Sequence, residues 1–201
     1  MPSRTSIIAL SVIAVTVPIL LVTFGLPAVS TNDVRSNNSP SIYNSTDYNF
    51  SIQYPNGWIV DESVDKLSPT SSILVSFSDP DYEAIIAIGK ADDISYRSYG
   101  IITNVKDFAE LTKVQLQQTY GRNIVLTNEG NLSTYNVDAY FIEYAPLDDS
   151  TRNKIVFLMN GDSAYFVMYD VDANKHDKHV TQLEQSISTF SFLSRWMTYS
   201  N

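Results

Sequence analysis

Two histidines and three oxygen-bearing residues lie close together near the C-terminal end of the chain, where they could bind a metal ion. His176 and His179 are the only histidines, and their i, i+3 spacing places them on one side of a helix. Asp170, Asp172 and Asn174 match the first three ligand positions of a calcium-binding loop. Imidazoles with carboxylates suit zinc or copper, whereas carboxylates and amides suit calcium. One hypothesis is therefore a calcium or transition-metal site formed by Asp170, Asp172, His176 and His179.

The same segment also has a purely structural interpretation, which we favour. Lys175 stands where a calcium loop needs glycine for its turn, and Thr181 stands where it needs a bidentate glutamate. His176 falls on the same side of the expected helix as Leu183, so we expect it to flank the core. We expect His179 to be solvated. The segment would then be the end of a strand followed by a helix.

Motifs of the common catalytic classes are missing or incomplete. The run 161–165, Gly-Asp-Ser-Ala-Tyr, begins like a serine nucleophile elbow but lacks the final glycine. The chain has no H-E-x-x-H, no phosphate-binding loop and no G-x-G-x-x-G. It also has no cysteine, which excludes thiol catalysis, disulfides and zinc–thiolate sites. We therefore expect a non-enzymatic protein without a cofactor, with calcium or another divalent metal as the alternative.

Charge limits the kinds of partner that the protein can have. The 201 residues carry a net charge of −9, from 13 Lys and Arg against 22 Asp and Glu. Arg4 is the only charged residue among the first 30, so residues 31–201 hold 12 basic and 22 acidic side chains, a net charge of −10. A surface this negative repels phosphate backbones, so we expect no nucleic-acid binding.

An uncharged apolar run near the N-terminus predicts insertion into or passage across a membrane. Residues 7–29 contain no charged side chain and would span about 34 Å as a helix, which is enough for a bilayer core. Arg4 before the run and Asp33 after it favour export of the C-terminal part. Residues 1–30 are either a signal anchor or a signal peptide cut near Ser30. The apolar core, 7–26, is longer than the ~7–15 residues of a signal peptide, which favours the anchor.

Three further parts follow this segment. Residues 31–46 are rich in Ser and Asn and predict a flexible spacer. Residues 47–193 carry the periodic apolar pattern of one folded domain, and residues 194–201 form a short tail. Glycosylation is permitted at sequons that begin at Asn37, Asn44, Asn49 and Asn131.

Alternation of apolar and polar residues predicts most of the domain as strands. At the start, strand 48–54 is followed by the turn 55–57 and a second apolar run at 58–60, which predicts a hairpin. Asn160-Gly161 predicts another hairpin between the last two strands. The remaining predicted strands are 72–78, 83–89, 123–128, 135–145, 154–159 and 163–170.

Two stretches have helical instead of strand periodicity. Residues 105–120 predict an amphipathic helix with Asn104 as N-cap and Gly121 as C-cap. Residues 173–190 predict a second helix, capped by Asp172 or Asn174. Many strands with two helices predict an α+β fold, in which a central antiparallel sheet is covered by helices.

The domain opens with the motif Phe50-x-Ile52-x-Tyr54-Pro55-x-Gly57-Trp58 and closes with Ser186-x-Ser188-Thr189-Phe190. These two motifs resemble the PsbP-like family, which is named for an extrinsic lumenal subunit of photosystem II. The resemblance covers roughly residues 46–193. It implies an α/β/α sandwich with a central antiparallel sheet, and it makes Phe50, Tyr54, Pro55, Gly57 and Trp58 a structural signature.

The resemblance also implies a role for the protein. It implies a non-enzymatic accessory or binding protein outside the cytoplasm, similar to exported archaeal relatives and not to a chloroplast protein. Photosynthetic members assist a manganese–calcium cluster, but no motif here carries that task. We expect a domain that is tethered to the membrane through residues 7–29, or secreted, and that binds a membrane-associated protein complex.

Overall fold

In the computed structural model of the chain, the described residues are 39–63, 65–68, 71–91, 104–132, 137–161 and 163–193. The predicted membrane segment 7–29, most of the spacer and the tail 194–201 lie outside these ranges. Within the ranges, no helix is both long and apolar enough to cross a membrane.

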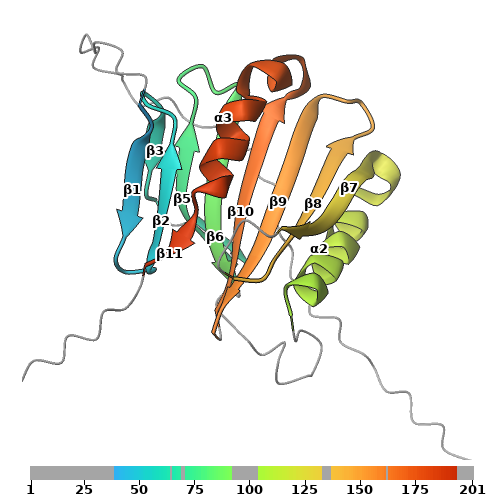
Figure 1. The fold of residues 1–201 in the computed structure, drawn as a ribbon. Coiled ribbons are helices and arrows are strands. Elements are labelled where there is room, and N and C mark those ends of the chain that lie inside the picture. Colours follow the sequence, from blue (N-terminus) through green and yellow to red (C-terminus); the bar gives the residue numbers. More distant parts are fainter. Residues whose placement is uncertain are drawn as a thin grey trace, which may run out of the picture.

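Eight strands form a main sheet in which every pairing is antiparallel, as predicted. The strand order is β3-β5-β6-β10-β9-β8-β7, with β4 beside β5 (Figure 1). The strands are β3 (Ile59–Asp61), β4 (Asp65–Ser68), β5 (Ser71–Ser78), β6 (Ala84–Ala91), β7 (Ile124–Leu132), β8 (Ala139–Pro146), β9 (Thr151–Asn160) and β10 (Ser163–Asp172). The predicted Asn160-Gly161 hairpin is confirmed: Asn160 pairs with Ser163, and Gly161 has a φ of 59°.

A second, three-stranded sheet corrects two predictions about the start of the domain. It has the order β1 (Ser41–Ser45), β2 (Phe50–Tyr54), β11 (Ser191–Phe192). Since β1 pairs with β2 along its whole length, ordered structure begins before residue 47, within the predicted spacer. The predicted hairpin around the turn 55–57 does not form, because β3 pairs with β5 of the main sheet instead. The turn, with Gly57 at a φ of 84°, thus passes the chain from one sheet to the other.

Helices α2 (Val105–Tyr120) and α3 (His176–Ser188) cover opposite faces of the main sheet. The prediction for α2 is confirmed, including the caps: Asn104 accepts hydrogen bonds from the backbone of Lys106 and Asp107, and Gly121 follows the last turn. The start of α3 differs from the prediction. Residues 173–175 form a 3-10 turn, and neither Asp172 nor Asn174 is the cap; the N-cap position is Lys175, without a side-chain hydrogen bond.

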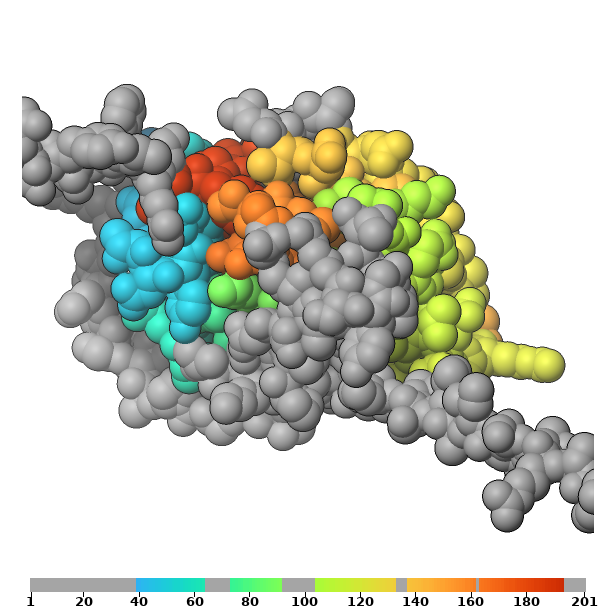
Figure 2. Space-filling view, turned by 90° about the horizontal axis from the view of Figure 1, so that it is seen from below, coloured from blue at the N-terminus to red at the C-terminus, as the bar shows by residue number. Residues whose placement is uncertain are grey.

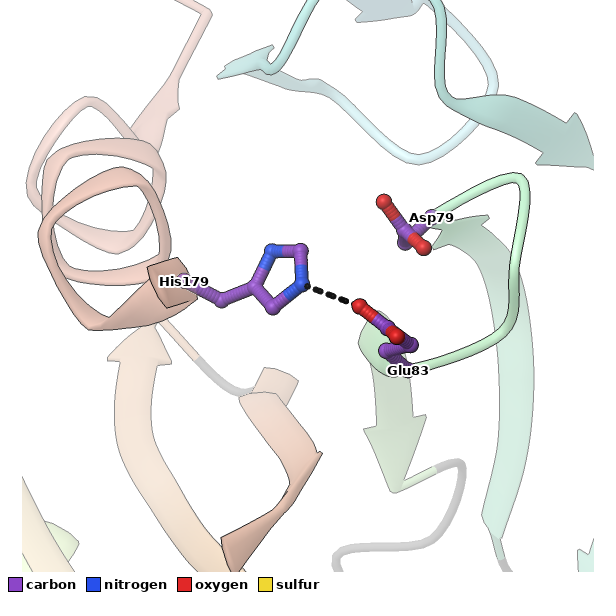
Figure 3. Close-up of side chains that lie close together, drawn as sticks. All are labelled: Asp79, Glu83 and His179. Carbon is purple, nitrogen blue, oxygen red and sulfur yellow. Dashed lines mark hydrogen bonds and ion pairs between the residues drawn. The ribbon is translucent and has the colours of Figure 1, made fainter. Parts of the chain in front are cut away.

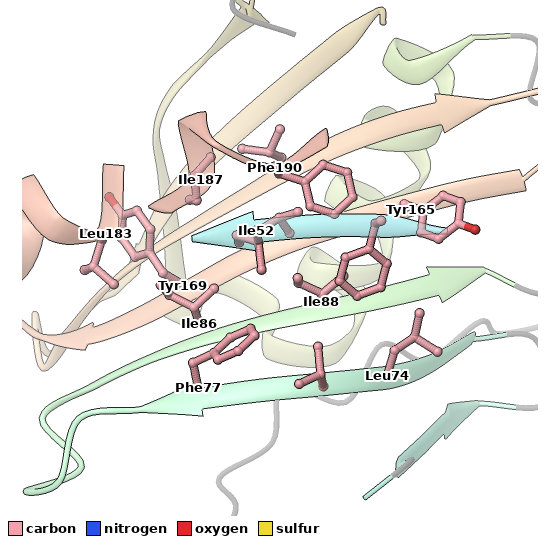
Figure 4. Close-up of a cluster of buried hydrophobic side chains, with 14 of the residues drawn as sticks. Ile52, Leu74, Phe77, Ile86, Ile88, Tyr165, Tyr169, Leu183, Ile187 and Phe190 are labelled. Carbon is pink, nitrogen blue, oxygen red and sulfur yellow. The ribbon is translucent and has the colours of Figure 1, made fainter. Parts of the chain in front are cut away.

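The strands alternate their side chains between two cores, one under each helix. On the α3 face, Ile86, Val167 and Tyr169 pack with Leu183 and with residues of β2 (Figure 4). On the α2 face, strand side chains including Phe157 and Phe166 pack against α2. Seen from below, β1 and β2 lie on one side of the molecule and α2 on the other (Figure 2). The second sheet therefore adds to the α3 face only.

Candidate functional site

The four residues of the hypothetical metal site do not come together. Asp170 and Asp172 share the side of β10 that carries Phe166, which packs under α2. His179 lies under α3, on the opposite face. Asp172 is exposed at the end of its strand. Side chains two apart on a strand point to the same face, so these two aspartates cannot turn toward α3 together with Tyr169 and Val171.

The prediction that His179 is solvated is wrong, whereas His176 lies beside the core as predicted. His179 is fully buried, with 2% of its surface exposed, and its ring makes a T-shaped contact with Trp58 at a centroid distance of 6.1 Å. His176 keeps 30% of its side chain exposed. The buried stripe of α3 runs through His179, Leu183 and Ile187, at i, i+4 and i+8. His176 precedes this stripe by three residues and lies at its flank.

His179 is part of a cluster that joins the start of α3 to the turn between β5 and β6. Its Nε2 lies 3.3 Å from Oε2 of Glu83, and the Nζ atoms of Lys175 and Lys178 each lie 2.5 Å from a Glu83 oxygen. Asp79 completes the group, with one ligand-type atom from Asp79, Glu83 and His179 within 4.8 Å of one another (Figure 3). These three are the residues in the described part of the chain that are placed to share a metal ion.

The β5–β6 turn holds Asp79 firmly in this position. Its backbone N–H donates to the carbonyl of Ala84, and its own carbonyl accepts from Tyr82. Its Oδ1 accepts from the backbone N–H of Asp81. Tyr82 adopts a left-handed φ of 56°, which closes the turn. The side chain of Asp79 is therefore occupied in supporting the backbone as well as facing Glu83.

Charge is balanced within the cluster. The hydrogen bonds from Lys175, Lys178 and His179 lower the pKa of Glu83 to about 2. Glu83 in turn raises the pKa of Lys178. The two carboxylates of Asp79 and Glu83 thus face two ammonium groups. A metal ion at this place would compete with both lysines for Glu83, whereas an ion-pair cluster needs no further ligand.

A signal for this cluster was present in the sequence. Lys175, Lys178 and His179 follow the i, i+3, i+4 spacing of one helical face, and Asp79 and Glu83 flank a predicted turn. The sequence does not show that these two segments meet, because they are more than 90 residues apart.

Comparison with known proteins identifies the family. A sequence profile described as PsbP-like protein matches residues 6–192. The chain belongs to the PsbP-like family. The match begins before the predicted membrane segment and ends at the last residue of β11, so it extends over every described strand and helix. The resemblance stated from the two motifs is therefore confirmed.

One solved structure supports the fold of this PsbP-like chain. Cyanobacterial PsbP from Synechocystis sp. PCC 6803 superposes with a TM-score of 0.61 at 16% identity, covering 82% of this chain and 98% of that one. A Pseudomonas aeruginosa protein of unknown function gives a TM-score of 0.42 at 13% identity, covering 75% and 94%. None of the curated proteins matches in sequence. At 16% identity, the likeness to cyanobacterial PsbP establishes the fold alone.

Proposed function

We propose that this PsbP-like chain is a non-enzymatic accessory domain that works outside the cytoplasm and binds a membrane-associated protein complex. Residues 7–29 hold it at the membrane or direct its secretion. One observation carries the proposal: the family match begins at residue 6 and runs through the whole domain. The apolar run and the domain thus belong to one family pattern, and the net charge of −10 after residue 30 suits a basic protein partner.

The histidine–carboxylate cluster supports the non-enzymatic part of the proposal. A general base needs an open site beside it in which a substrate atom can lie. His179 is 2% exposed and faces Glu83 through Nε2, while its ring makes a T-shaped contact with Trp58. The lysines neutralise Glu83. Structural attachment of α3 accounts for each of these contacts.

Cell fractionation and protease accessibility test the location. The full chain with a C-terminal tag should resist alkaline extraction from membranes, and protease added to intact cells should remove the tag. The variant Leu20→Lys/Leu21→Lys places two charges at the centre of the apolar run and should abolish membrane association. The matched control Leu20→Ala/Leu21→Ala should keep it. Release of a mature protein starting at Thr31 would favour secretion over anchoring, and a tag protected inside the cell would overturn the proposal.

Cross-linking in intact membranes tests the partner. Repeated purification of the cross-linked full chain should recover the same membrane-associated proteins. The Leu20→Lys/Leu21→Lys variant, which stays away from the membrane, should recover none of them. Repeated recovery of no common protein would contradict the binding role and leave the location test unaffected.

A divalent-metal site is the second candidate function, now moved to Asp79, Glu83 and His179. The observation that favours it is the approach of their ligand atoms to within 4.8 Å. Calorimetry with Zn²⁺ and Ca²⁺ on the full chain decides the question. A metal site requires heat that His179→Ala abolishes and His176→Ala, the matched control on the same helix, leaves unchanged. No heat with the wild-type chain, or equal heat with both variants, removes this candidate.

A further inference from the structure

A groove of about 440 Å³ lies between the end of β2 and the C-terminal half of α3. The two elements stand side by side in Figure 1. One wall includes Gln53, Tyr54 and Asn56, and the other includes Gln182 and Gln185. The groove thus lies where the two family motifs meet, since one motif contains Tyr54 and the other begins beyond Gln185. Its volume falls in the range of roughly 300–1,000 Å³ of small-molecule sites.

The groove is uncharged although the protein is strongly acidic. None of the ten residues that line it, all in the described part of the chain, is Asp, Glu, Lys, Arg or His. A charged ligand would lose water here without gaining a counter-charge, and that loss is costly. The lining therefore selects for a neutral ligand.

Amide side chains supply most of its hydrogen-bonding capacity. The side chains of Gln53, Gln182 and Gln185 are exposed, and each presents a carbonyl acceptor next to an NH₂ donor. A sugar hydroxyl both donates and accepts, so two neighbouring hydroxyls match one planar amide. Tyr54 also borders the groove, and its half-buried ring stacks on Phe77 of the core at 4.6 Å. The amides are suited to a polyhydroxylated ligand.

The main chain of β2 argues against an extended peptide as the occupant. Peptides that add to a sheet need an edge strand with free backbone groups. One edge of β2 is paired with β1 along its length. On the other edge, Phe50 and Ser51 pair with β11, and the backbone N–H of Gln53 donates to Oγ1 of Thr189 at 2.9 Å. Strand addition has no free edge to use here.

We propose that this groove is a binding site for neutral carbohydrate, and that the three glutamine amides recognise its hydroxyl groups. The role of such binding in holding the domain at a glycan-bearing surface rests on the proposed location outside the cytoplasm. Binding by the purified chain does not depend on that location.

Titration of the full chain tests the site. The detergent must carry no sugar head group, since such a head group would compete. The probes are maltotetraose, cellotetraose and chitotetraose as neutral glycans, tetragalacturonate as an acidic glycan, and a Gly-Ser hexapeptide as a neutral peptide. At least one neutral glycan should bind saturably by calorimetry, and tetragalacturonate and the peptide should not.

Matched glutamine variants locate the binding. Gln182→Ala/Gln185→Ala should weaken the affinity about tenfold or more, because two hydrogen-bonding side chains are lost. Gln117→Ala/Gln118→Ala removes two exposed amides from α2, far from the groove, and should leave the affinity unchanged. Thermal unfolding of both variants checks that they fold.

Three results would overturn the proposal: no binding of any neutral glycan, equal affinity of the Gln182→Ala/Gln185→Ala variant, or displacement of the glycan by the peptide. Glycan binding by a chain whose C-terminal tag stays inside the cell would refute the proposed location alone. An external tag without glycan binding would refute this site alone.

Discussion

On the two faces of the main sheet, the pKa of a carboxyl group is shifted in opposite directions. On the α3 face, Lys175 and Lys178 lower the pKa of Glu83 to about 2. On the α2 face, burial and the charge of Asp172 raise the pKa of Asp170 to about 6. The two shifts have different causes: hydrogen bonds from the start of α3 favour the charged form of Glu83, whereas burial disfavours the charged form of Asp170.

The helices themselves are attached by different means. The first turn of α2 is capped by Asn104, and its Lys113 contacts Glu129 of β7 at 2.6 Å. The first turn of α3 has no side-chain cap and is held through Glu83 on a distant turn. One helix start is therefore fixed by its own sequence and the other by the tertiary structure.

The largest expected loss of stability comes from replacing a glycine of the main sheet, and it should differ between the two faces. A Cβ on Gly89 would lie 2.0 Å from the ring of Phe166 on the α2 face, so Gly89→Ala should cost about 3 kcal/mol of unfolding free energy. On the α3 face, a Cβ on Gly130 would meet Phe141 at 3.2 Å, and Gly130→Ala should cost less than about 1 kcal/mol. Urea unfolding measures both. Equal losses would show that the α2 face is no more tightly packed.

A stabilising effect is expected from Asp170→Asn. Because its folded pKa of about 6 lies above the ordinary 3.8, the folded state binds the proton more tightly, and stability falls as pH rises between these values. Removing the charge should therefore stabilise the protein by ~2 kcal/mol at pH 7 and have little effect below pH 3.8. Urea unfolding across this pH range measures the difference. The exposed Asp47→Asn is the control, and a loss of stability at pH 7 would contradict the assignment.

Substitutions at the first turns of α2 and α3 should lower the free energy of unfolding by smaller amounts. Asn104→Ala removes two hydrogen bonds to the first turn of α2 and should cost about 1 kcal/mol. Lys175→Ala removes one part-buried ion pair at the start of α3 but leaves Lys178 paired with Glu83, and should cost about 0.5 kcal/mol or less. Chemical denaturation of the two variants compares them directly. A larger loss for Lys175→Ala would mean that α3 depends on this single pair.

The last test concerns how the stability of the protein changes with pH, more than the size of the loss at one pH. The carboxylate of Glu83 has a folded pKa of about 2 against an ordinary 4.5, so its stabilising contribution is present above pH 4.5 and is lost as pH falls toward 2. Glu83→Gln should lower the thermal midpoint at pH 7 and flatten its decline over this range. Glu110→Gln, on α2, is the control. An unchanged acid decline in Glu83→Gln would show that other groups control it.

Most local structure could be predicted from the sequence. Helix 105–120 was predicted with both caps because periodicity and capping act over a few neighbouring residues. The Asn160-Gly161 hairpin could be predicted for the same reason, because neighbouring residues determine its turn. The start of α3 was missed because it has no capping side chain to mark it. The candidate site could not be predicted, since a buried histidine is identified by the segments that cover it.

The sequence by itself determined the α+β class, the family, the acidic charge and the alternation that gives each strand two faces. Only the tertiary structure decided that β2 joins β1 and β11 instead of β3, that His179 meets Glu83, and that the two family motifs border one groove. Turn residues fix where the chain bends. Which strand it then pairs with depends on burial and backbone hydrogen bonds summed over partners far apart in the chain.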